Sequence, residues 1–307
     1  MSRNNNLEKS DARWFRLFTA PWLIGFLLLS LAPMILGFVI SLTNYNGVSP
    51  NLARFIGFAN YARAFTDPNV GEAALRTLVL LLIYVPSNLF IGLSLALLIN
   101  AGPRARGFFR SLYYLPSIIP IVGAAFIWRA MLNGNSGIVN NLLAAINPNW
   151  KVNWLIDFAT PSLVSMSLWL ALGLSTVLYV AALQTVPPEL EQAALMDGAT
   201  YLQRLRHVVF PLISPVVFYQ VLIAIIYALG VVAEPLLLGG SSSGQNLTNV
   251  PNANVVLNVY TYQQMFLYQR FGYAAAILWL TFAGAVAVTI GLFATRKYWV
   301  HSESGNI

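Results

Sequence analysis

The sequence predicts an all-α membrane protein with six transmembrane helices and both termini in the cytoplasm. Of its 307 residues, 58% are hydrophobic and only 9% are charged, whereas about 25% of the residues of a soluble domain are charged. Six apolar stretches are each long enough to cross a hydrocarbon core about 30 Å thick. They are apolar throughout rather than alternating, as barrel strands would be, and a helix satisfies its own backbone hydrogen bonds, as lipid requires.

The first apolar stretch is interpreted as a span rather than a secretory signal peptide. It is too long for the apolar core of a signal peptide, contains two prolines and lacks a small-residue cleavage site beyond it. Prolines in other spans favour either a water-lined passage or a bundle that tolerates kinks. The six predicted spans are 20–42, 75–99, 109–132, 161–183, 211–233 and 273–295.

The positions of Lys and Arg set the predicted orientation. With both termini inside, eleven of the 17 basic residues fall on the cytoplasmic side, where membrane proteins carry an excess of them. The chain then divides into a cytoplasmic segment (1–19), a transmembrane domain (20–295) with a cytoplasmic coupling loop (184–210), and a cytoplasmic tail (296–307). The eleven residues are Arg3, Lys9, Arg13, Arg16, Arg104, Arg106, Arg110, Arg204, Arg206, Arg296 and Lys297.

The composition argues against several kinds of site. Cys is absent and there are only two His residues, which excludes thiolate sites and disulfides and leaves little basis for a histidine metal centre. None of the three lysines has Gly before it and Ser or Thr after it, as in a phosphate-binding Walker sequence, so no nucleotide site is predicted in this chain. Neither a zinc-peptidase sequence nor a serine elbow is present, which argues against a membrane enzyme. The basic residues form no stripe of the kind that binds nucleic acid.

The coupling loop carries strong helix signals. The prolines at 187 and 188 suit a helix start, Glu189 and Glu191 lie in the first turn, where the helix dipole favours anions, and Gly198 suits the C-terminal cap. Thr200 and Gln203 then form a capping-box pair. This pattern predicts one helix of about three turns and a second short helix at 201–207, ending before Pro211 opens the fifth span.

Small residues lie on one face of the first loop helix. Leu190, Ala193, Ala194 and Asp197 share this face at spacings of three and four. Two alanines there permit close approach by another protein, and so short a helix is marginal without a partner. The spacing alone is equally compatible with a loop that lies on its own membrane domain.

The segment 187–199, Pro-Pro-Glu-Leu-Glu-Gln-Ala-Ala-Leu-Met-Asp-Gly-Ala, followed by Val-Val-Phe-Pro at 208–211, resembles the EAA loop of ABC importer permeases. The Glu of that family coincides with Gln192, and Glu191 is displaced by one position. The charge that usually contacts the ATPase is therefore either neutralised or supplied from another helix face. The resemblance implies that the ATPase-coupling residues are Glu189, Leu190, Glu191, Gln192, Ala193, Ala194, Asp197, Gly198 and Ala199.

The resemblance covers nearly the whole chain and points to the carbohydrate-uptake subgroup, because the segments at 57–61, 114–116 and 272–274 also agree with it. It implies the six-helix fold of a type I importer permease in a prokaryotic inner membrane, with no enzymatic activity and no cofactor in this chain. The implied partners are a second permease subunit, two ATPase subunits that bind ATP and Mg²⁺, and an extracytoplasmic solute-binding protein that delivers the sugar.

A sugar path needs aromatic rings and scattered hydrogen-bonding groups inside the bundle, since sugars present both hydroxyls and apolar ring faces. By resemblance, sugar contacts come from the helices on either side of the coupling loop, although aromatic packing is the alternative role for Trp169 and Tyr227. Asn88 is a further polar candidate. The predicted substrate path comprises Trp169, Leu170, Ala171, Leu174, Gln220, Ile223, Tyr227, Gly230 and Glu234.

An ATP-independent carrier or facilitator for a small polar solute is the alternative function. Glu234 is the only acidic residue near a predicted span, which gives an ion relay little support. No repeat of three spans is evident in the sequence. The sequence leaves open whether the solute is a sugar, a polyol or a sugar phosphate.

Overall fold

The computed structural model describes residues 2–49, 51, 53–101, 106–239 and 250–301. The chain divides into two compact units. Unit 1 comprises Met1–Thr66 and Gln264–Leu280, and unit 2 comprises Asp67–Gln263 and Thr281–Ile307. Arg104 and the last six residues of the predicted cytoplasmic tail lie outside the described residues.

The predicted all-helical membrane fold is confirmed. Within the described ranges, five helices are long and apolar enough to span a membrane, and a bent pair of helices brings the number to six. Four of the five helices coincide with predicted spans and are a few residues longer at one or both ends. The remaining one, Tyr201–Gly230, also includes the second helix of the loop. The five helices are Trp14–Ser41, Pro68–Asn100, Ala159–Gln184, Tyr201–Gly230 and Phe271–Trp299.

The third predicted span, 109–132, is not one straight helix. It consists of α5 (Arg106–Ile118) and α6 (Ile121–Met131), which meet at 106°. Pro120 precedes α6 with an extended backbone (φ −57°, ψ 139°), and the residue before a proline disfavours the helical conformation. Pro120 therefore divides the predicted span into two separate helices.

The fifth predicted span begins earlier than expected. The helix continues through Pro211, because α11 (Tyr201–Arg204), the π-helix η3 (Leu205–Val209) and α12 (Phe210–Gly230) follow one another as one 30-residue helix. The amide of Phe210 bonds to the carbonyl of Leu205, five residues back. This wider turn accommodates a proline ring that has no N–H to donate.

Unit 1 contains α1 (Ser2–Phe26), the π-helix η1 (Leu27–Leu31), α2 (Ala32–Ser41), α3 (Ala59–Thr66) and the first part of α15 (Phe271–Trp299). Asn60 on α3 donates 2.8 Å hydrogen bonds to the carbonyls of Ser41 and Thr43. Gly272 approaches the carbonyl of Thr43 so closely that a Cβ atom would clash with it. The turn after α2 is thus fixed by one amide side chain and one glycine.

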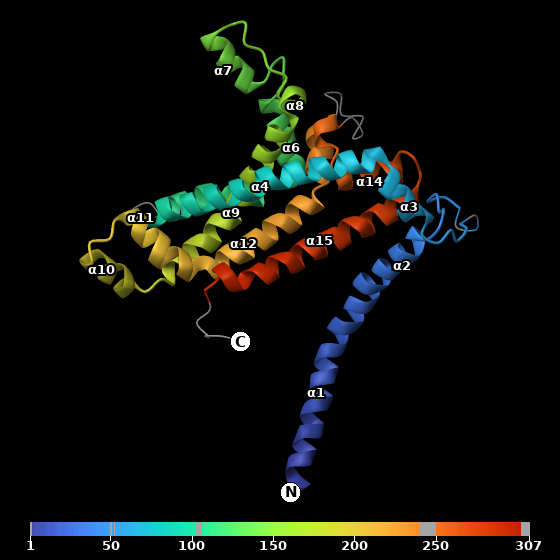
Figure 1. Ribbon diagram of the computed structural model, residues 1–307, viewed down its shortest axis with the longest axis horizontal. Helices are drawn as coiled ribbons and strands as arrows, with labels where there is room; N and C mark the ends of the chain where they lie inside the picture. Colours follow the sequence, from blue (N-terminus) through green and yellow to red (C-terminus); the bar gives the residue numbers. More distant parts are fainter. Residues whose placement is uncertain (1, 50, 52, 102–105, 240–249, 302–307) are drawn as a thin grey trace. The chain divides into compact units, whose positions relative to one another are not determined.

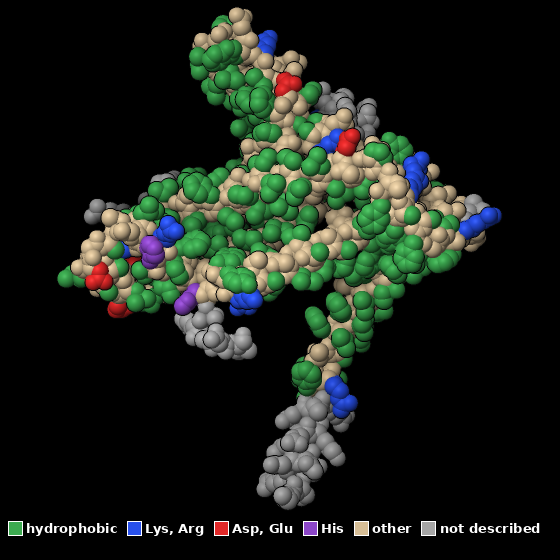
Figure 2. Space-filling view, in the orientation of Figure 1, with side chains coloured by type: hydrophobic (Ala, Val, Ile, Leu, Met, Phe, Trp, Pro, Cys, Tyr) green, Lys and Arg blue, Asp and Glu red, His purple; other side chains and the backbone are tan. Residues whose placement is uncertain are grey.

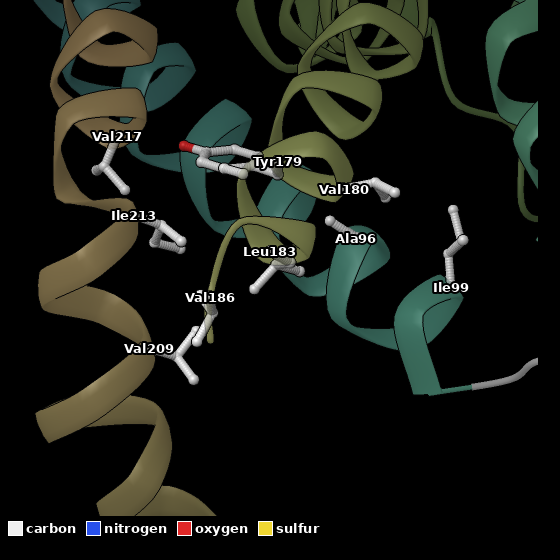
Figure 3. Close-up of a cluster of buried hydrophobic side chains, with 10 residues drawn as sticks. Ala96, Ile99, Tyr179, Val180, Leu183, Val186, Val209, Ile213 and Val217 are labelled. Atoms are coloured by element: carbon white, nitrogen blue, oxygen red, sulfur yellow. The ribbon is translucent and has the colours of Figure 1, made fainter. Parts of the chain in front are cut away.

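Unit 2 is built around three long helices that run side by side, α4 (Pro68–Ala101), α9 (Ala159–Gln184) and α12 (Figure 1). A buried apolar cluster joins them near the coupling loop. In Figure 3, Tyr179 and Leu183 of α9 lie between Ala96 of α4 and Ile213 of α12. The ends of these helices are consequently held together where the loop leaves them.

Shorter helices complete unit 2. They are α7 (Ile138–Ile146), α8 (Trp154–Asp157), α10 (Pro188–Met196), α13 (Ala233–Gly239), the 3₁₀ turn η4 (Asn252–Asn254) and most of α14 (Leu257–Phe266). Hydrophobic side chains cover much of the visible face of the long helices, and charged side chains gather around α10 and α11 (Figure 2). This distribution fits long helices in lipid and a loop in water.

Candidate functional site

A cavity of about 320 Å³ lies inside unit 2, where α4, α5, α9, α12 and α13 meet. Its volume falls at the lower end of the range for small-molecule sites, about 300 to 1,000 Å³. Apolar side chains make up part of the wall, and hydroxyl, amide and carboxylate groups interrupt it. Such a wall suits a ligand with both polar groups and apolar faces.

Helix α4 turns its polar side chains inward. Thr77, Tyr84 and Asn88 are buried, at spacings of seven and four that place them along one side of the helix. Leu82 and Phe90 on the same helix are exposed. A span with an apolar outer face and a polar inner face is the arrangement expected where lipid lies outside and a polar cavity lies inside.

Three side chains from three helices form the polar network of the cavity. The hydroxyl of Ser175 on α9 donates a 3.2 Å hydrogen bond to Oδ1 of Asn88 on α4. Nε2 of Gln220 on α12 donates a 3.2 Å bond to the backbone carbonyl of Ser175. Asn88 Nδ2 is buried and has no hydrogen-bond partner among the described residues. These hydrogen bonds link α4, α9 and α12, and they leave Nδ2 of Asn88 as an unpaired donor among the described residues.

A second polar group lies where α12 meets α13. The hydroxyl of Tyr227 donates a 2.6 Å hydrogen bond to Oε1 of Glu234. The ring of Tyr84 lies 5.0 Å from the ring of Tyr227, centroid to centroid. The cavity therefore offers two aromatic rings beside a carboxylate that accepts hydrogen bonds.

Seven of the nine predicted substrate-path residues line this cavity, and two do not. Trp169 packs edge-on against Trp128 at 6.1 Å between ring centroids. Gly230 is exposed at the end of α12. The seven lining residues are Leu170, Ala171, Leu174, Gln220, Ile223, Tyr227 and Glu234. Contact of any of the nine residues with a transported solute stays a prediction.

The cavity also contains residues that were not predicted to line the path. Tyr84 comes from α4, Ser117 from α5, Ser167 and Ser175 from α9, and Tyr219 from α12. The seven- and four-residue spacing of Thr77, Tyr84 and Asn88 is a signal in the sequence that identifies the inner face of α4. The serines carry no comparable signal, because Ser is common on either face of a membrane helix.

The coupling loop has the predicted helix, turn and cap. Gly198 ends α10 with φ +76°, and it donates to the carbonyl of Leu195 while Ala199 donates to the carbonyl of Ala194. This is the Schellman arrangement that favours glycine at this position. The predicted capping box of Thr200 and Gln203 is present at the start of α11.

The predicted coupling residues are not all equally accessible. Gln192 and Ala193 are exposed, as are Glu189, Leu190, Asp197 and Gly198, whereas Glu191, Ala194 and Ala199 are half-buried. Glu191 shares a cavity of about 190 Å³ with Arg204. Nε of Arg204 is buried without a hydrogen-bond partner in the described part of the chain. The displaced carboxylate thus lies on the inner side of the loop, and the neutral Gln192 lies on the outer side.

Comparisons with known proteins agree with this architecture. Residues 88–296 match the model of a protein family described as binding-protein-dependent transport system inner membrane component. The chain is 30% identical to the arabinooligosaccharides transport system permease protein AraP of Bacillus subtilis, covering 85% of this chain and 81% of that protein. It is 28% identical to the trehalose/maltose transport system permease protein MalF of Thermococcus litoralis, covering 93% of this chain and 94% of that protein.

The fold has also been seen in a solved structure. A crystal structure of a bacterial ABC transporter involved in the import of the acidic polysaccharide alginate contains a chain that superposes with a TM-score of 0.80 at 24% identity. The superposition covers 95% of this chain and 98% of that chain. It shows that the two chains share a fold.

Proposed function

Because this chain belongs to the inner membrane components of binding-protein-dependent transport systems, we propose that it forms part of the route by which an ATP-driven importer takes up a carbohydrate. The family makes it a multi-pass inner membrane permease and not the ATPase itself.

The observation that carries the proposal is the wall of the cavity in unit 2. Tyr84 and Tyr227 supply aromatic rings, while Asn88, Gln220 and Glu234 supply hydrogen-bonding groups. A sugar needs both, since its hydroxyls require partners and its ring faces are apolar. The carbohydrate transporters among the relatives support the same class of cargo.

The coupling loop is the proposed ATPase contact. Leu190 and Leu195 are exposed, and Met196 exposes 88% of its surface. Apolar side chains of this size in a water-facing loop favour a protein partner. Two ATPase subunits that bind ATP and Mg²⁺ would hold this loop and the matching loop of a second permease.

One helix connects the two sites. Tyr201–Gly230 begins at the coupling loop and carries Gln220 and Tyr227 into the cavity wall. When the ATPase subunits close on ATP and move the loop, this helix moves the cavity wall with it. ATP and the loaded binding protein favour the outward-facing state only if they bind it better than the inward-facing state.

Proteoliposomes that contain this chain, its sister permease, the ATPase and the binding protein test the proposal. Labelled sugar should accumulate in the lumen only when ATP is supplied on the ATPase side. Uptake that continues in vesicles lacking the ATPase would instead identify a carrier or facilitator and contradict the proposal.

A further inference from the structure

We infer that the cavity in unit 2 takes an uncharged carbohydrate and rejects anionic ones, with Glu234 discriminating against negative charge and Asn88 donating to a hydroxyl of the cargo. The inference rests on the proposed function and narrows its substrate class. It separates neutral sugars from sugar phosphates, uronates and sulfonates.

The charge of the cavity wall is the first argument. Among the described residues that line the cavity, Glu234 is the only charged side chain, and it is only 6% exposed. A buried charge acts through a medium of low dielectric constant, where repulsion between like charges is stronger than in water. An anionic sugar placed there meets a carboxylate and no lining Lys, Arg or His from this part of the chain, so its approach is opposed.

The geometry of Glu234 is the second argument. Tyr227 donates to Oε1 at 2.6 Å and so holds the carboxylate in place beside the two tyrosine rings. A carboxylate only accepts hydrogen bonds, and those that it accepts from hydroxyls are stronger than bonds between neutral groups. Sugar hydroxyls are donors of this kind, whereas the charged oxygens of a phosphate or uronate are not.

The unused amide of Asn88 is the third argument. Asn88 is 3% exposed, and one end of its amide bonds to Ser175 while the other end has no partner among the described residues. Whichever way the amide is turned, one polar end of this cavity-lining residue stays unsatisfied among the described residues. A buried polar group without a partner is destabilising, so its retention fits a hydroxyl group that completes the pairing when the cargo binds.

The decisive experiment determines whether the sugars that the transporter accumulates are neutral or anionic. The complete transporter, reconstituted in proteoliposomes, is offered a mixture of neutral oligosaccharides, uronate oligosaccharides and sugar phosphates, and the lumen is analysed by mass spectrometry. Uncharged sugars that accumulate with ATP support the inference. An accumulating anionic sugar overturns it while leaving the importer function intact. ATP hydrolysis that is stimulated by the binding protein without accumulation of any carbohydrate overturns the proposed function itself.

A second measurement tests whether the preference for neutral over anionic sugars comes from Glu234 in this cavity. The transporter without its binding protein is placed in nanodiscs, and its affinity for the cargo is compared with that for the same sugar oxidised to a uronate. We expect the neutral form to bind at least tenfold more tightly. Glu234→Gln should reduce this preference to less than about threefold, and Glu234→Asp should retain it. Glu72→Gln removes an exposed carboxylate paired with Arg76 outside the cavity and should leave the preference unchanged.

Asn88→Ala tests the donor. It should weaken binding of the cargo about fivefold, as expected for the loss of one hydrogen bond, while the affinity of the isolated binding protein for the sugar stays the same. Asn141→Ala, at an exposed position on α7, is the matched control. Copurification of the full complex checks that each variant assembles. Equal affinity for the neutral and oxidised sugars in the wild type, or a preference unchanged by Glu234→Gln, would refute the inference.

Discussion

A Cβ atom on Gly173 would lie 2.6 Å from the carbonyl oxygen of Tyr113. Helix α9 therefore touches the backbone of α5 at a point where no side chain fits. The contact lies beside the cavity, because Leu174 and Ser117 on the same two helices line its wall. Close helix contacts at small residues are a common way to associate helices in membranes.

Gly173→Ala should accordingly destabilise the protein, despite the better helix propensity of alanine. Forcing a methyl group into this contact should cost about 1–3 kcal/mol, seen as a lower unfolding midpoint of the detergent-purified chain. Gly284→Ala on α15 is the control, since a Cβ atom there has nothing within 4 Å. A control variant that unfolds as early as Gly173→Ala would show that the close contact is not the cause.

Gly198→Leu should uncouple ATP hydrolysis from uptake. Leucine in the left-handed conformation costs about 1–2 kcal/mol, so the turn at φ +76° should open and shift the loop. ATPase activity of the reconstituted complex and sugar uptake are measured together, with binding of sugar by the isolated binding protein expected to stay unchanged. Gly198→Asn should be milder, because asparagine tolerates this conformation. Normal uptake by Gly198→Leu would argue against the coupling role.

Gln192→Glu should strengthen binding of the ATPase. The new charge is exposed, so the gain should be up to about fivefold, as for a surface ion pair worth up to 1 kcal/mol, and should fade as salt rises. Affinity is measured between the permease pair in nanodiscs and the isolated ATPase. Glu191→Gln is the matched change on the inner side of the loop and should alter this affinity little. If Glu191→Gln instead weakened binding of the ATPase by more than Gln192→Glu strengthens it, the ATPase would contact the other face of α10.

Tyr227→Phe should weaken transport without preventing assembly. The substitution removes the 2.6 Å bond to a buried carboxylate, and a hydrogen bond to a charged group is worth about 1.5–3 kcal/mol. Because the carboxylate is then no longer held in position in the cavity wall, the KM for uptake, measured against the concentration of loaded binding protein, should rise. Tyr298→Phe removes a hydroxyl from an exposed tyrosine and should leave the KM unchanged. A KM that stays the same in Tyr227→Phe would contradict the role given to this pair.

Features that depend on neighbouring residues could be predicted from the sequence. The cap at Gly198 and the capping box of Thr200 and Gln203 follow from a few adjacent side chains and occur where expected. Span composition depends only on local hydropathy, which is why the long helices were found. The break at Pro120 was harder to predict, because a proline within an apolar run is compatible with either a kinked helix or a complete turn.

Features that depend on contacts between residues far apart in the chain could not be predicted from the sequence in this way. Tyr84 and Ser175 meet in one cavity although 91 positions separate them in the sequence, and only helix packing brings them together. Trp169, an aromatic residue predicted to lie on the path, packs on Trp128 and is not among the residues that line the cavity. The continuation through Pro211 depends on a π-helical turn, for which the residues themselves give no clear pattern.

The 30-residue helix Tyr201–Gly230 has a consequence for how such proteins diversify. Its loop end and Gln220 in the cavity wall are about 30 Å apart at 1.5 Å per residue, so no single substitution alters both surfaces directly. If the cavity end meets the cargo and the loop end meets the ATPase, as proposed, a substitution at one end of this helix can change the choice of cargo and leave the ATPase contact as it is.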